Sequence, residues 1–269
     1  MLLKRLLTAL AVTGLVQLAY ADQSLTVVSP DKNIQLLVTH QTAGGLVYSI
    51  TYKGKAVVLP SVVGMKLANP VVSLQQFSLD HIDSILVDEN WKPVWGEQSQ
   101  IRNNYRQLLL SLTDKSGSGI RIQLMFRVFN DGVGFRYIFP QQDKLNHFII
   151  ADELTGFALT GDHTAFWIPG DYDTNEYAYY NSALSKVDAS GGGFAQEIHA
   201  KTFFDKNAVQ TPLMMKTAEG LYINLHEAAL VNYPAMNLIL DKSNYTFRSQ
   251  LVPDAVGNKA YLQAPFSTP

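Results

Sequence analysis

Hydrophobic and polar side chains alternate with a period of two along residues 120–139. The apolar positions are Ile120, Ile122, Leu124, Phe126 and Val128, followed by Phe135, Tyr137 and Phe139. Between the two halves, Asn130, Asp131 and Gly132 supply residue types that tolerate positive φ. A period of two places alternate side chains on opposite faces of a strand. The stretch therefore predicts two antiparallel strands joined by a tight turn.

Short apolar or alternating runs recur along the rest of the chain. They cover residues 25–28, 34–39, 46–52, 56–59, 108–112, 147–151, 164–168, 213–216, 221–225 and 236–240. Residues 69–90 are expected to mix strand and loop, and residues 227–230 are expected to form a short helix. Many short strands, separated by Gly, Pro and Asn and without a long amphipathic helix, favour an all-β fold. The specific prediction is a two-sheet antiparallel β-sandwich.

Two segments depart from this pattern. Residues 171–185 are polar and aromatic without sustained alternation, and they are predicted to form a long loop of the kind that often carries function. Residues 190–193, which read Ser-Gly-Gly-Gly, predict a flexible tip.

The N-terminus has the features of a secretory signal peptide. Lys4 and Arg5 precede an apolar run over residues 6–18, and Ala19 and Ala21 fit the small-x-small cleavage rule. The run is short for a membrane span, so we expect residues 1–21 to be removed, leaving a periplasmic or secreted chain without a span. An uncleaved N-terminal anchor is the alternative.

Composition narrows the possible functions. The chain has 269 residues, of which 47% are hydrophobic, and it has no cysteine. A disulfide framework and a thiolate metal site are therefore excluded. The formal net charge is −2, and it becomes −4 when the two cations of the signal peptide are removed. This balance argues against nucleic acid as a partner.

Several catalytic motifs are missing. There is no G-x-S-x-G nucleophile elbow, and His226 and Glu227 are not followed by the second histidine of a zinc-binding helix. The histidines are scattered without metal-ligand spacing, at His40, His81, His147, His163, His199 and His226.

Residues 171–176 form an acidic run, Asp-Tyr-Asp-Thr-Asn-Glu. Oxygen ligands at alternate positions are typical of an EF-hand, but the sixth position is Glu176 and the twelfth is Ser182. The EF-hand interpretation therefore fails. Two alternatives stay open, a loop that lends one hard oxygen ligand to calcium and a solvated acidic loop.

Aromatic residues near strand ends suggest either a sugar-stacking platform or ordinary packing. The candidates are Trp91, Trp95, Trp167, Tyr177, Tyr179 and Tyr180.

Five longer motifs, taken in order, resemble the N-terminal domain of glycoside hydrolase family 97. They are WKPVWGE (91–97), IRNNY (101–105), FRVFNDGVGFRY (126–137), FWIPGDYDTNEY (166–177) and LYINLHEAAL (221–230). The resemblance covers residues 24–269 and is nearest to exported α-glucosidases of bacterial starch utilisation. It implies a galactose-mutarotase-like super-β-sandwich over residues 22–269, which in the family precedes a catalytic (β/α)8 barrel.

The resemblance also implies where chemistry is located. In the family the catalytic carboxylates lie on the barrel, so no catalytic residue is assigned here, and substrate-binding residues are unknown. One glutamate ligand of a calcium ion near the glycosidic oxygen comes from the N-terminal domain, and the motif GDYDTNEY places its counterpart at Glu176. Residues 264–269 resemble the junction before the barrel, so the chain is expected to lack the barrel.

Three hypotheses for the whole chain follow. In the first, the chain is the sugar-side domain of an α-glucosidase, supports the barrel, and is inactive alone. In the second, it is a free-standing periplasmic carbohydrate-binding module for α-glucan oligosaccharides. In the third, it is an inactive fragment with an exposed apolar docking face.

Overall fold

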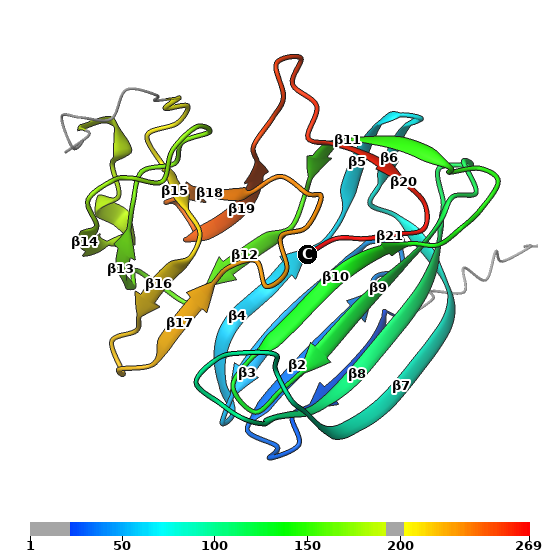
Figure 1. The fold of residues 1–269 in the computed structure, drawn as a ribbon, viewed down its shortest axis with the longest axis horizontal. Helices are drawn as coiled ribbons and strands as arrows, with labels where there is room; N and C mark the ends of the chain where they lie inside the picture. Colours follow the sequence, from blue (N-terminus) through cyan, green and yellow to red (C-terminus); the bar gives the residue numbers. More distant parts are fainter. Residues whose placement is uncertain (1–21, 192–201) are drawn as a thin grey trace, which may run out of the picture.

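The largest element of the fold is an eight-stranded antiparallel sheet (Figure 1). The computed structural model describes residues 22–191 and 202–269; the predicted signal peptide and residues 192–193 of the predicted tip lie outside this part. In spatial order the strands are β1 (Gln23–Val28), β2 (Ile34–His40), β3 (Leu46–Tyr52), β4 (Lys55–Val62), β12 (Gly156–Leu159), β19 (Thr246–Leu251), β18 (Met236–Asp241) and β15 (Ala208–Gln210). Strand β12 pairs with both β4 and β19, so it joins the N-terminal and C-terminal parts of the sheet.

A five-stranded sheet packs against the first. Its order is β21 (Phe266–Ser267), β10 (Val133–Phe139), β9 (Arg121–Val128), β8 (Ile101–Asp114) and β7 (Phe77–Trp91). The predicted hairpin is β9–β10, with Phe126 opposite Phe135 and a turn in which the Phe129 N–H donates to the Gly132 carbonyl at 2.8 Å. Together the two sheets confirm the predicted β-sandwich.

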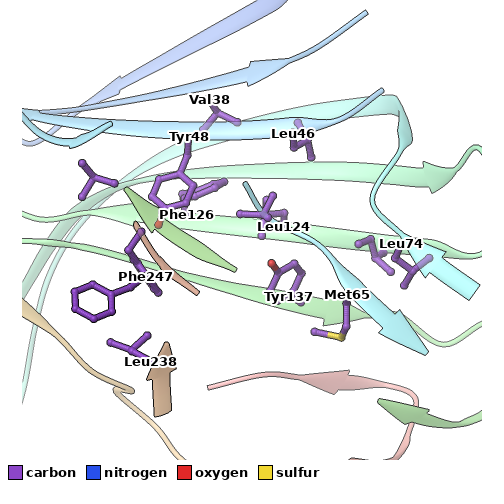
Figure 2. Packing of buried hydrophobic residues seen from close by; sticks show 14 of the residues in the cluster. Val38, Leu46, Tyr48, Met65, Leu74, Leu124, Phe126, Tyr137, Leu238 and Phe247 are labelled. Carbon is purple, nitrogen blue, oxygen red and sulfur yellow. The ribbon is translucent and has the colours of Figure 1, made fainter. Parts of the chain in front are cut away.

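The hydrophobic core fills the space between these sheets (Figure 2). Tyr48 of β3 lies 6.2 Å from Phe126 and 5.3 Å from Phe135 between ring centroids. The Tyr48 hydroxyl donates to the Gly156 carbonyl at 2.8 Å, which satisfies its polar atom inside the core. Each buried aromatic ring removes on the order of 150–250 Å² from water, so these rings dominate the sandwich energetically.

Two four-stranded sheets complete the structure. The first consists of β20 (Ala260–Gln263), β11 (His147–Glu153), β5 (Met65–Asn69) and β6 (Val71–Leu74). The second consists of β14 (Tyr180–Ala183), β13 (Thr164–Trp167), β16 (Leu213–Lys216) and β17 (Tyr222–Leu225), at the left of Figure 1. Two 3-10 turns follow β14, namely η1 (Leu184–Lys186) and η2 (Ala189–Gly191).

Two local predictions need correction. The helix expected at 227–230 is wrong, because the Glu227 carboxylate accepts hydrogen bonds from the Met236 N–H and the Thr211 hydroxyl, and the segment runs as an open loop. The loop expected at 171–185 is shorter than predicted, because its last part forms β14 and the start of η1.

No helix in residues 22–191 and 202–269 has the length and apolar character needed to cross a membrane.

Candidate metal-ligand loop and neighbouring hollow

The acidic run lies on the loop between β13 and β14, and backbone pairing with the eight-stranded sheet fixes where this loop starts. Pro169 forms a bridge with Val209 of β15, and the Gly170 N–H donates to the Ala208 carbonyl at 2.8 Å. A Cβ at Gly170 would lie 2.4 Å from the Ala208 Cβ, so the approach of the two backbones requires glycine.

The Asp171 carboxylate is the centre of the loop. Its side chain is only 3% exposed and accepts four hydrogen bonds. Oδ1 accepts the backbone N–H groups of Asp173 (2.7 Å) and Thr174 (3.1 Å). Oδ2 accepts the Tyr177 hydroxyl (2.6 Å) and the Thr202 N–H (2.9 Å). The acidic run therefore contains one buried, fully hydrogen-bonded carboxylate.

The Tyr177 hydroxyl is the side-chain hydrogen-bond donor to the Asp171 carboxylate. It is buried, and burial raises its pKa, as do the hydrogen bond to Asp171 and the charge of that carboxylate. The phenol therefore keeps its proton at neutral pH and remains a hydrogen-bond donor.

Two buried amide side chains connect the loop to the sandwich. Asn237 of β18 accepts the Asp171 N–H at 3.3 Å and donates to the Asp171 carbonyl at 3.2 Å. Gln210 of β15 donates to the carbonyls of Pro169 (2.9 Å) and Thr174 (2.8 Å). The loop thus has a fixed position relative to the largest sheet.

Glu176, the predicted calcium ligand, lies near the end of this loop and is exposed to solvent. Its N–H donates to the Thr174 hydroxyl at 3.2 Å. In the described parts of the chain, no three His, Asp or Glu side chains gather closely enough to hold a metal ion. Glu176 can therefore offer one hard oxygen ligand, and calcium, which takes six to eight oxygens, would need the others from elsewhere.

The structure divides the aromatic candidates into two groups. Trp167 is 3% exposed, stacks on Tyr180 with 4.8 Å between centroids, and donates to the Ser182 hydroxyl; its role is packing. Trp91, Trp95 and Tyr179 are exposed. These three side chains are accessible for stacking on a sugar ring.

A hollow of about 660 Å³ lies beside the β9–β10 hairpin and the loop that follows β17. Its polar lining includes Arg127, Arg136, Glu153, Tyr222, Glu227 and Tyr233. The Arg127 Nε donates to the Gln107 Oε1 at 3.0 Å, and its guanidinium lies 4.6 Å from the Tyr105 ring centroid. Pro269 also lines the hollow, and Figure 1 shows the C-terminus beside β10.

Glu153 is the buried carboxyl of this hollow, with 9% exposure. It accepts hydrogen bonds from the hydroxyls of Thr155 (2.6 Å) and Tyr233 (2.8 Å). Burial raises the pKa of Glu153, and the charges of Glu227 and Asp152 raise it further, against the two hydrogen bonds that lower it.

Neither Glu153 nor Asp171 was predicted from the sequence as a site residue. Glu153 ends an apolar strand, and a charged residue at that position was the available signal. Asp171 follows Pro169 and Gly170 directly, and this turn chemistry could have separated it from the exposed acids after it.

The chain matches a known protein family over nearly its whole length. Residues 27–269 match the family described as Glycosyl-hydrolase 97 N-terminal. Among solved structures, a glycoside hydrolase family 97 enzyme from Pseudoalteromonas sp. strain K8, in complex with acarbose, superimposes with a TM-score of 0.78 at 29% identity. That alignment covers 91% of this chain and 34% of the enzyme. A β-arabinopyranosidase shares the fold, with a TM-score of 0.73 at 19% identity over 92% of this chain and 39% of that one.

Two relatives by sequence are also named as glycoside hydrolases. A retaining α-galactosidase of Bacteroides thetaiotaomicron is 26% identical over 230 residues, which is 81% of this chain and 30% of the relative. A probable retaining α-galactosidase of Streptomyces bingchenggensis is 26% identical over 207 residues, 76% of this chain and 30% of the relative.

Fold and comparisons thus define a β-sandwich domain of a glycoside hydrolase. The chain belongs to glycoside hydrolase family 97 and corresponds to its N-terminal domain. It spans about a third of the length of the relatives it matches.

Proposed function

We propose that this chain is the sugar-side N-terminal domain of a periplasmic or secreted α-glucosidase that acts on α-glucan oligosaccharides from starch. The observation that carries the calcium part of the proposal is the exposed Glu176 on a loop whose backbone is tied to the sandwich. The α-glucan part is supported by the acarbose and panose complexes of family 97 enzymes that are 29% identical to this chain. In this proposal a (β/α)8 barrel supplies the paired carboxyl groups that glycoside hydrolysis requires. The chain alone is therefore inactive on α-glucosides.

Calcium is the metal that suits this loop. Glu176 offers a carboxylate oxygen, which is the ligand type that calcium prefers, and among the described residues no three His, Asp or Glu side chains gather closely enough to bind the ion by themselves. Glu176 would hold the ion together with carboxylates of the barrel. When bound there, calcium would stabilise negative charge that develops near the glycosidic oxygen.

An α-galactoside is the alternative to an α-glucoside as the substrate. A family 97 enzyme from Pseudoalteromonas sp. strain K8, 29% identical to this chain, is solved in complex with acarbose, and an E480Q enzyme from the same strain is solved in complex with panose. The curated relatives, at 26% identity, are named as α-galactosidases. We propose glucosides, and comparing p-nitrophenyl α-glucoside with the α-galactoside, on this domain joined to a family 97 barrel, decides between them.

The calcium role is tested by E176Q in the same joined protein. The variant is expected to raise the calcium concentration for half-maximal activity by about 10-fold or more, because one charged ligand is lost. E219Q, at an exposed glutamate before β17, is the matched control. Equal calcium dependence of the two variants would reject Glu176 as a ligand, and clear turnover by the isolated chain would reject the domain proposal.

A free-standing carbohydrate-binding module is the second candidate, because Trp91, Trp95 and Tyr179 are exposed. Calorimetric titration of the isolated chain with maltoheptaose separates the two. Saturable heat that disappears when Trp95 is replaced by Ala would favour the module.

A further inference from the structure

We propose that Asp171 is a positioning residue for Glu176. Its buried carboxylate shapes the loop and sets the direction in which Glu176 leaves the sandwich. This loop geometry follows from the contacts of the chain itself, and its consequence for catalysis rests on the function proposed above.

First, Asp171 binds residues on both sides of Glu176 in the chain. Thr174, two residues before Glu176, donates its N–H to Asp171 Oδ1. Tyr177, the next residue after Glu176, donates its hydroxyl to Oδ2 at 2.6 Å. One carboxylate therefore holds the backbone before Glu176 and the side chain after it.

Second, Asp171 is itself fixed. Asn237 binds both the N–H and the carbonyl of Asp171, and Asn237 belongs to β18 of the largest sheet. The Thr202 N–H donates to Oδ2 at 2.9 Å from a separate segment. Asp171 therefore connects the loop that carries Glu176 to the sandwich core.

Third, the chemistry of the contacts requires a carboxylate at this position. All four partners of Asp171 are donors, so both of its side-chain oxygens have to accept. An asparagine would turn an NH2 group toward two of these donors. The Tyr177 hydroxyl can rotate to accept from that group, but a backbone N–H cannot, so at least one buried N–H would lose its acceptor. Asp173 and Glu176 are exposed, so the acidic run contains one organising carboxylate and two surface carboxylates.

The absence of cysteine from the sequence permits a direct test. E176C gives the chain a unique thiol, to which a nitroxide spin label is attached, and electron paramagnetic resonance then reports mobility at this position. In the E176C background, D171N is expected to raise the mobile fraction of the spectrum at least twofold. D241N is the matched control, because Asp241 also binds a backbone N–H and a hydroxyl, both from Ser243, but on an exposed turn. It is expected to leave the spectrum unchanged.

Two further measurements separate positioning from general damage. The label is moved to E219C, where D171N is expected to change nothing. Y177F, which removes one of the four donors and keeps the ring, is expected to give a smaller rise at position 176 and applies even if D171N does not fold. Spectra at position 176 that are the same in Y177F and in the parent, or in folded D171N and in D241N, would overturn the proposal. Because the label replaces Glu176, this result does not depend on calcium, and failure here leaves the separate E176Q calcium test unaffected.

Discussion

The surroundings of Glu153 make its contribution to the free energy of unfolding depend on pH. Its pKa lies above the ordinary value of 4.5, mainly because of burial. Above pH 4.5 the folded chain therefore binds more protons at this site than the unfolded chain does. The contribution of Glu153 to the free energy of unfolding is then largest at low pH and decreases as pH rises toward the folded pKa, by about 1.4 kcal/mol for each pH unit between the unfolded and folded pKa values.

The variant E153Q tests this sign. Glutamine retains the shape and can bond to both the Thr155 and Tyr233 hydroxyls, but it does not titrate. Measured by urea unfolding across pH, the stability of the parent relative to E153Q is expected to fall as pH rises above 4.5. For D241N the sign is opposite, because hydrogen bonds from Ser243 lower the pKa of Asp241 and its contribution is lost as pH falls through the folded pKa. A flat difference for E153Q would contradict the role given to burial.

At the scale of the elements, two turns are joined across the sandwich. The Asn130 Oδ1, in the β9–β10 turn, accepts the backbone N–H of Asp31, in the β1–β2 turn, at 2.9 Å. This contact links hairpins of the two facing sheets at their tips.

N130A removes that link without touching the core. We expect the free energy of unfolding to fall by about 1 kcal/mol, the usual net value of one hydrogen bond. Asn90, exposed at the end of β7, supplies the control N90A, for which a change within about 0.5 kcal/mol is expected. Equal effects of the two substitutions would show that the contact between the turns contributes nothing.

Elements with a local signal could be predicted from the sequence. The β9–β10 hairpin carries its alternation and its turn residues within twenty positions, so the sequence alone was sufficient. Strands β12 and β21 are two to four residues long and exist because partners distant in sequence pair with them. Tertiary contacts of this kind leave no periodicity to detect.

The candidate site likewise combines features with a local sequence signal and features that depend on distant contacts. The motif located the loop on which Glu176 lies, and the ligand role of Glu176 stays a prediction. The burial of Asp171 depends on Asn237 and Thr202, which lie 66 and 31 residues away. The helix expected at 227–230 failed for the same reason, since Glu227 binds groups outside its own segment. The local sequence pattern cannot reveal such bonds, because the same amino acid is buried or exposed according to partners that are distant in the sequence.

At the scale of the molecule, the end of the β7–β8 hairpin is an exposed apolar tip, defined by Trp91, Val94 and Trp95. Val94 is 92% exposed and Trp95 is 85% exposed. Exposed apolar groups gathered in this way mark contact surfaces or sources of self-association.

W95S is expected to weaken concentration-dependent association of the isolated chain, measured by sedimentation velocity. Because the indole is almost fully exposed, the free energy of unfolding should change by no more than about 0.5 kcal/mol. V256S, at a residue that is 78% exposed on another loop, serves as the control and should leave association unchanged. Unaltered association in W95S would remove the tip as the contact surface.

The pairing of β21 with β10 has a consequence for the time course of folding. The Tyr137 N–H donates to the Thr268 hydroxyl across 131 residues of chain. At the usual pace of ribosomal synthesis, those residues take roughly 7–26 s to appear. For that interval the nascent polypeptide presents the bare edge of a hydrophobic strand, and a chaperone that masks strand edges would find its target there.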